Sequence, residues 1–237
     1  MDPYVYEDTN VLINKLDIRD EEILIDVEAQ LFIANVLDIS NIIKNINIQT
    51  YKSFQAVHKY LFHELYSWAG EFRTVNIYKS EQALTGLSIS YSDEKHIESD
   101  LEKIFNWSKT IHWSYDNKKL VEDFAKFMIE IWRIHPFREG NTRTTSVFMH
   151  LFAEINELEF NGQLLSHNPG YLRKALVLAA VEEAPEPEYL LIMLRDALNL
   201  MKSNGSNQKE EQSEKYKVIK KYDVSKYNQK PFETDKE

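Results

Sequence analysis

The 237-residue chain contains no cysteine, which excludes several kinds of chemistry at once. Without cysteine there is no disulfide, no thiolate nucleophile and no cysteine–zinc site. Glycine is also scarce, with six residues, and no stretch reads G-x-x-x-x-G-K-[S/T], the pattern of a P-loop. A nucleotide site in this chain must therefore be built from some other backbone arrangement.

A basic excess is missing as well. The net charge is −10, which argues against direct binding of nucleic acid or of a membrane surface. No apolar run approaches the length of a membrane span. The first residues lack the basic and apolar regions of a Sec signal peptide, so we expect a cytoplasmic protein. Export as an effector by a route without such a signal stays an alternative.

The chain does have enough apolar residues to build a core: 43% are hydrophobic, and 12 are phenylalanines. Their spacing is mostly that of amphipathic helices, which predicts a mainly α fold. Helices are expected over 20–37, 50–68, 93–108, 118–134 and 141–156, and two more should begin at Pro169 and Pro187. The 118–134 segment is apolar on nearly every side and should be the central helix.

Three details of these helices can be predicted further. In the first helix, Ile23, Val27, Leu31 and Ala34 have the spacing of an inward face, and in the third, Ser92 is a candidate N-cap. Two histidines on the 50–68 helix, His58 and His63, lie five positions apart and so do not share a face. We interpret both as surface or packing residues and not as metal ligands.

Two regions do not follow the helical pattern. Residues 73–90 alternate apolar and polar side chains on either side of a turn, which indicates a β-hairpin. From residue 202 to 237 the chain is polar and charged, so we expect one domain over 1–201 followed by a flexible tail.

The stretch that concentrates chemistry is H-P-F-R-E-G-N-T-R over residues 135–143. Pro136 disfavours the helical conformation at the residue before it, so the central helix should end at His135. Gly140 permits a sharp turn, and a new helix should open near Asn141. The N-terminus of a helix offers unpaired N–H groups and a partial positive charge, which suits a phosphate. A base, an acid, an anion-binding backbone and the cation of Arg143 therefore lie within nine residues.

This stretch resembles the signature of the Fic family, written H-P-F-x-[D/E]-G-N-[G/K]-R-x-x-R. Two further segments are similar to Fic proteins: residues 9–16 resemble the N-terminal stretch of small bacterial members, and residues 67–77 resemble the lead into the family's hairpin "flap". The resemblance covers Met1 to about Met201. It implies a Fic-type helical bundle with an N-terminal helical extension, and the hairpin at 73–90 beside the active-site loop.

The resemblance also implies an activity: a protein adenylyltransferase that moves AMP from ATP, with Mg²⁺, to a tyrosine, threonine or serine hydroxyl of another protein. By position in the motif, His135 is the general base and Glu139 the magnesium ligand, and Arg143 contacts the outer phosphates. Gly140, Asn141 and Thr142 form the anion hole. Pro136 and Phe137 support the loop. The flap residues that would dock the target protein are Val75, Asn76, Ile77, Tyr78, Leu87 and Ile89.

The chain departs from the family pattern at two positions. Thr142 stands where the family has a small or lysine residue, and Ser146 stands where it has a second arginine. The family's inhibitory pattern [S/T]-x-x-x-E-[G/N] has no convincing copy. We therefore expect control by a separate small antitoxin-like protein, in which case the chain would be a toxin. DNA gyrase and topoisomerase IV are targets by family analogy alone.

Two alternatives remain open at this stage. The same site could transfer a phosphoryl group or another nucleotide, because the fold also supports such reactions. The two departures could instead mark a non-catalytic module that binds a nucleotide or a partner protein. The intact His135 argues against that second alternative, since a pure binding site has no need of a base.

Overall fold

The computed structural model describes residues 2–7, 9–43, 46–79, 89–166, 169–200 and 233–234. This part of the chain is mainly helical, as the sequence predicts. Its helices are α1 (Glu21–Ile43), α2 (Tyr51–Phe62), α3 (Ile97–Ser108), α4 (Leu120–Ile134), α5 (Asn141–Ile155), α6 (Gly162–Ser166), α7 (Pro169–Ala180) and α8 (Glu188–Ala197). Among the described residues, no helix is both long enough and apolar enough to cross a membrane.

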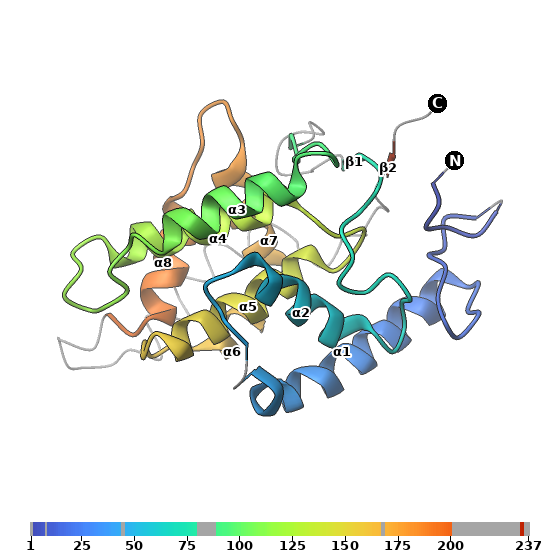
Figure 1. Ribbon diagram of the computed structural model, residues 1–237, viewed down its shortest axis with the longest axis horizontal. Helices are drawn as coiled ribbons and strands as arrows, with labels where there is room; N and C mark the ends of the chain where they lie inside the picture. The colour runs from blue at the N-terminus through green and yellow to red at the C-terminus, as the bar shows by residue number, and fades with distance from the viewer. Residues whose placement is uncertain are drawn as a thin grey trace.

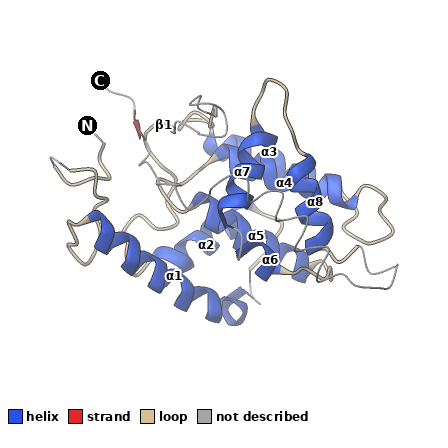
Figure 2. Cartoon of the chain, turned by 180° about the vertical axis from the view of Figure 1, so that it is seen from behind, coloured by secondary structure: helices blue, strands red, loops and turns tan. Residues whose placement is uncertain are grey.

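Helix α4 is the centre of the bundle. It packs against α3, α5, α7 and α8, and it carries buried side chains on nearly every side. Phe124, Phe127, Met128 and Ile131 have no exposed surface. The aromatic neighbours of the two phenylalanines come from α3, from α5 and from the loop residues Trp113 and Phe160. The expectation of a central apolar helix is therefore confirmed. Helix α1 lies along one side of the molecule, beside α2 (Figures 1 and 2), and it also contacts α5.

The strands lie beyond the helices at one end of the molecule (Figure 1). Strand β1 (Ile77–Tyr78) pairs antiparallel with β2 (Glu233–Thr234), with Ile77 opposite Thr234. The turn of the expected hairpin and its residue Leu87 lie outside the described residues. Residues 89–91 are described and form no strand. The expected tail also lies outside the description, except for β2.

Three helical details differ from the sequence-based expectation. Helix α1 is turned partly away from the expected face: Val27 and Leu31 pack against the core as expected, but Ile23 is 54% exposed and Ala34 is exposed. Leu24 and Glu28 are buried in their place. The inward face includes the acidic side chain of Glu28, so a search for regularly spaced apolar residues does not find it. Helix α3 begins four residues later than expected, because the Ser92 hydroxyl donates to Asp100 and does not cap the helix. The short helix α6 was not predicted.

One buried cation connects the flap region to the end of the central helix. Arg73 is 2% exposed, and its Nε donates to the carbonyl of His135 at 2.8 Å. Its two terminal nitrogens donate to the carbonyls of Val75 and Ser92, and its backbone N–H donates to the Pro136 carbonyl at 2.8 Å. Burial lowers the pKa of Arg73 to about 10, so the side chain stays charged at neutral pH. Arg73 therefore binds carbonyls at the helix end that the helix itself cannot satisfy.

We predict that Arg73→Met destabilises the fold by about 3 kcal/mol, since several buried carbonyls lose a charged donor. The matched control is Arg133→Met, which removes a half-exposed ion pair with Glu130 on the same central helix. It should cost less than about 1 kcal/mol. Chemical denaturation of both variants measures the difference. Equal losses would mean that the Arg73 network adds nothing beyond an ordinary surface pair.

Candidate active site

The segment between α4 and α5 reverses the chain through two residues in the left-handed region. His135 follows the last helical residue with φ 49° and ψ 58°, and Gly140 precedes α5 with φ 79°. A side chain at Gly140 would place its Cβ 2.6 Å from the ring of Phe62. Glycine is therefore required there both by the backbone angle and by the close approach of α2. Both helix boundaries agree with the prediction from Pro136 and Gly140.

The loop between these two residues is fixed by its own side chains. Asn141 is 3% exposed; its amide oxygen accepts from the Phe137 N–H at 2.9 Å and its amide nitrogen donates to the Phe137 carbonyl at 2.8 Å. Phe137 is fully buried and stacks on His58, with ring centroids 3.7 Å apart. The Thr144 hydroxyl donates to the Gly140 carbonyl at 2.9 Å. The side chain of Asn141 thus holds the loop closed, and its backbone N–H starts α5.

The geometry of His135 fixes which ring nitrogen carries the proton. Its Nδ1 lies 2.6 Å from the Trp132 carbonyl, which can only accept, so Nδ1 bears the hydrogen and the lone pair lies on Nε2. The ring is 1% exposed and stacks on Tyr91, with centroids 4.1 Å apart. Burial, assisted by the nearby Arg173, holds the pKa of His135 well below its usual value. The imidazole is therefore neutral at physiological pH, as a proton acceptor must be.

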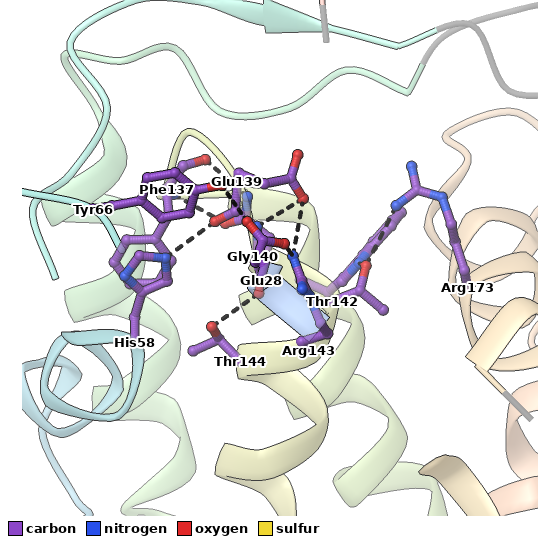
Figure 3. Close-up of polar contacts among 12 residues, drawn as sticks. Glu28, His58, Tyr66, Phe137, Glu139, Gly140, Thr142, Arg143, Thr144 and Arg173 are labelled. Atoms are coloured by element: carbon purple, nitrogen blue, oxygen red, sulfur yellow. Dashed lines mark hydrogen bonds and ion pairs between the residues drawn. The ribbon is translucent and has the colours of Figure 1, made fainter. Parts of the chain in front are cut away.

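Glu139 and Arg143 face one another across the first turn of α5 (Figure 3). One Glu139 oxygen accepts from the Gly140 N–H at 2.9 Å and lies 3.6 Å from the Arg143 guanidinium. Burial would raise the pKa of the Glu139 carboxyl, but Arg143 and Lys79 lower it below its ordinary value. The carboxylate is therefore ionised. Its side chain keeps 27% of its surface exposed, so a ligand can reach it.

The donor set can be tested for a divalent cation. In the described ranges, no three acidic, histidine or cysteine side chains gather around a common point. Magnesium does not need such a cage, because it commonly takes one or two carboxylates and completes its shell with phosphate oxygens and waters. An ionised, accessible Glu139 beside a helix N-terminus fits that mode of binding.

Thr142, the first departure from the family pattern, is turned toward two donors. Its hydroxyl oxygen accepts from the Trp132 indole N–H at 2.9 Å and lies 3.4 Å from a terminal nitrogen of Arg173. Arg173 comes from α7 and lies on the opposite side of Thr142 from Arg143 (Figure 3). Two arginines from different helices therefore flank the N-terminus of α5. Ser146, the second departure, lies one turn further along α5 and is half-buried.

Several residues of the site could not be found from the sequence motif. Arg138, given no role there, forms an ion pair with Asp2, in which Nε and a terminal nitrogen both donate to one carboxylate oxygen, at 3.1 and 2.7 Å. His58 is fully buried: its Nδ1 accepts from the Gly70 N–H at 2.8 Å, and its Nε2 lies 3.1 Å from the Glu139 carbonyl. Lys79 follows β1, is 8% exposed, and acts electrostatically on both His135 and Glu139. The sequence-based interpretation of His58 as a packing residue agrees with its position.

The first of the residues expected to dock a target lie on the segment that Arg73 joins to this loop, through bonds to the carbonyls of Val75 and His135. Ile77 is buried and Tyr78 is 44% exposed on β1, while Val75 and Asn76 precede the strand and are half-buried. Ile89 is 3% exposed and belongs to the core. On the other side of α5, an apolar cavity of about 760 Å³ lies between α1, α5, α6 and α7 and reaches Arg143 and Ser146. A ligand in that cavity would touch the first turns of α5.

Solved structures establish the class of fold. The N-terminal Fic domain of a VirB-translocated Bep effector from Bartonella quintana superposes with a TM-score of 0.68 at 18% identity, covering 82% of this chain and 90% of that one. The BepC protein of Bartonella tribocorum with bound AMPPNP gives a TM-score of 0.66 at 19% identity, covering 82% and 95%. At such identities the likeness concerns the fold alone. The helical bundle is a Fic-type fold.

Sequence comparison then establishes the family. The model of the Fic/DOC family matches residues 49–153. The probable protein adenylyltransferase y4lH of Sinorhizobium fredii is 30% identical over 165 residues, which span 68% of this chain and 79% of that protein. The probable protein adenylyltransferase Fic of Escherichia coli is 24% identical over 152 residues, spanning 64% and 72%. The chain belongs to the Fic/DOC family.

The buried His58 predicts a measurable pH dependence of stability. Burial lowers its pKa from 6.5 to about 3, so between these values the unfolded chain binds a proton that the folded chain does not. Stability should therefore be lost as pH falls below 6.5. We expect the free energy of unfolding of His58→Gln to fall less steeply with decreasing pH, by about 1.4 kcal/mol per pH unit. Urea denaturation between about pH 6.5 and pH 4.5 measures the slope.

The control for this prediction is His63→Gln, because His63 lies on the same segment and is exposed. Its slope should match that of the wild type. The slope is the relevant quantity, since His58→Gln can lower stability at every pH by disturbing the stack on Phe137. A variant slope equal to the wild-type slope would contradict the neutral, buried state of His58.

Proposed function

We propose that the protein is a protein adenylyltransferase that transfers AMP from Mg²⁺-ATP to a tyrosine, threonine or serine hydroxyl of a target protein. The observation that carries this proposal is the tautomer of His135: the bond from Nδ1 to the Trp132 carbonyl leaves the lone pair on Nε2, within five residues of an ionised acid and a helix N-terminus. A site that only held a nucleotide would need the last two features and not the first. The names of the relatives support the same activity.

In the proposed reaction, the target hydroxyl oxygen attacks the α-phosphorus of ATP. The new P–O bond joins AMP to the target, the bond from the α-phosphorus to the bridging oxygen breaks, and pyrophosphate leaves. The hydroxyl proton goes to Nε2 of His135, whose lowered pKa keeps it neutral beforehand. The Tyr91 ring and the Trp132 carbonyl hold the imidazole in one orientation, so no reorganisation is needed when the proton moves.

The remaining loop residues would bind the nucleotide's charge. Glu139 would hold the Mg²⁺, which would neutralise the pyrophosphate as it leaves. The backbone N–H groups of Asn141 and Thr142 open α5 and would bind phosphate oxygens. The N–H of Gly140, which donates to Glu139 in this structure, would join them once Glu139 turns to the cation. Pro136 and Phe137 would keep these groups aligned through the buried loop. Arg143 would contact the outer phosphates from the same helix turn.

Arg173 would provide the second cation that Ser146 cannot. It lies 3.4 Å from the Thr142 hydroxyl, beside the proposed anion hole, and its charge reaches His135. In this proposal the two departures belong together, because a hydroxyl at position 142 seats an arginine that comes from α7. The phosphates would then lie between Arg143 and Arg173.

The target protein would dock by adding a strand to β1. The support is that the edge of β1 already takes an antiparallel strand, β2, through main-chain bonds. Docking of this kind fixes an extended segment irrespective of most of its side chains. Leu87, expected on the same surface, lies outside the described residues.

Control by a small antitoxin-like protein remains a prediction, and so do gyrase and topoisomerase IV as targets. The cavity that reaches Ser146 is where such an inhibitor would touch α5.

The test of the function is label transfer from ATP to proteins of a bacterial lysate. ATP labelled on the α-phosphate should label a protein band, and ATP labelled on the γ-phosphate should not. His135→Ala should abolish the band, because it removes the proposed proton acceptor. Bands labelled from the γ-phosphate would contradict adenylyl transfer and indicate phosphoryl transfer. A band that survives in His135→Ala would remove the proposed base.

A separate prediction concerns the second cation. Arg173→Gln should raise the KM for ATP about tenfold, the effect of losing about 1.4 kcal/mol of phosphate binding. Lys174→Gln, one residue further along α7, is the matched control and should leave KM unchanged. Adding Ser146→Arg to Arg173→Gln should restore part of the affinity. An unchanged KM in Arg173→Gln would show that Arg173 contacts Thr142 and does not contribute to phosphate binding.

A further inference from the structure

The inward face of α1 carries an acidic side chain at its centre. Glu28 is 9% exposed, and it lies outside residues 49–153, the part of the chain that the family model matches. Buried carboxylates are rare in proteins unless they are paired. The partners of Glu28 therefore indicate why it is there.

Both oxygens of Glu28 are engaged, and by different elements. One accepts from a terminal nitrogen of Arg143 on α5, and the other accepts from the hydroxyl of Tyr66, which follows α2. Tyr66 is itself 1% exposed and stacks on Trp68 with centroids 4.4 Å apart. Figure 3 shows Glu28 between Tyr66 and Arg143. The Tyr66 hydroxyl thus fixes the carboxylate, and the carboxylate fixes the guanidinium.

Arg143 is held on its other sides as well. Its guanidinium carbon lies 4.9 Å from the centre of the Phe62 ring and 5.5 Å from the centre of the Phe32 ring, and the group lies 3.6 Å from Glu139. Its side chain nevertheless keeps 30% of its surface exposed. Two aromatic rings and Glu28 therefore limit its rotation while a face remains accessible to a ligand.

We propose that Glu28 is a positioning residue, which holds Arg143 in place to bind the outer phosphates of the nucleotide. This inference rests on the proposed nucleotide site. A free arginine loses rotamer freedom when it binds a ligand, and a ligand that meets a fixed guanidinium does not have to supply that ordering. Helix α1, through Glu28 and Phe32, is then part of the nucleotide site.

Glu28 has a second effect through the charge of Glu139. Arg143 forms ion pairs with both acids. If Glu28 were neutral, Glu139 would be the stronger attraction for the guanidinium, and the two would draw together. The carboxylate proposed to hold Mg²⁺ would then be occupied by an arginine. Glu28 thus keeps Arg143 available for phosphate and Glu139 available for the cation.

The test is Glu28→Gln, which keeps the shape of the side chain and an oxygen that can accept from Tyr66, and removes the charge. Calorimetric titration with AMPPNP and with AMP, both with Mg²⁺, measures nucleotide binding without any transfer reaction. We expect AMPPNP to bind about tenfold more weakly and AMP to bind as it does to the wild type, because AMP lacks the outer phosphates. A purely structural role for Glu28 would weaken both nucleotides alike.

Three further variants make the result specific. Glu22→Gln neutralises an exposed acid on the same helix and should bind both nucleotides as the wild type does. In an Arg143→Ala background, Glu28→Gln should cause no additional loss of AMPPNP affinity, because Glu28 acts through that arginine. Tyr66→Phe should give a smaller loss than Glu28→Gln, since the carboxylate keeps its charge and loses only its anchor.

The outcomes separate this inference from the proposed function. Equal affinity of Glu28→Gln and wild type for AMPPNP, or an equal loss for AMP and AMPPNP, would overturn the role of Glu28 and leave adenylyl transfer standing. A wild-type protein that bound neither nucleotide would overturn both. An additional loss in the Arg143→Ala background would mean that Glu28 acts by some route other than Arg143.

Discussion

The structure depends on a chain reversal in which α4 stops and α5 begins within six residues. The last carbonyls of a helix and the first N–H groups of the next have no partners within their own helices, and a buried site cannot leave them unpaired. Arg73 binds the carbonyl of His135 and, through its backbone, that of Pro136. Asn141 binds both backbone groups of Phe137. The satisfied groups make the loop rigid, and the first N–H groups of α5 are the ones proposed to bind phosphate.

This arrangement explains why the proposed base, His135, can be buried. Burial disfavours the charged form of a histidine. That would hinder a reaction that needs an imidazolium, but it helps one that needs a neutral proton acceptor. The left-handed conformation at His135 directs the ring back over the end of α4, where the Trp132 carbonyl selects the tautomer. The same backbone turn that ends the helix therefore prepares the chemistry, and little has to move during a reaction.

The sequence predicted the parts of the site that lie close together in the chain. Pro136 and Gly140 give both helix boundaries, and the apolar spacing of 118–134 gives the central helix. It could not predict Glu28, Arg73 or Arg173, because each reaches the loop from another element through the packing of helices. Glu28 was hidden further by its neighbours, because a buried acid does not follow hydrophobic periodicity. The apolar residues of α1 suggested Ile23, Val27, Leu31 and Ala34 as the inward face, and only Val27 and Leu31 pack against the core. The residues that position and charge the site from other elements thus reach it through contacts that are distant in the sequence.

The same long-range contacts couple the outer helix to the site. Helix α1 packs on α2 and α5, and it presents Ile23, Ile33 and Leu37 to solvent. Its position is therefore set by fewer contacts than that of α4, yet it supplies Glu28 and Phe32 to Arg143. A ligand that requires an ordered Arg143 binds best when α1 is docked, and by linkage it must stabilise that docked state by the same free energy. If Arg143 binds phosphate as proposed, the docking of α1 and the binding of phosphate are coupled equilibria.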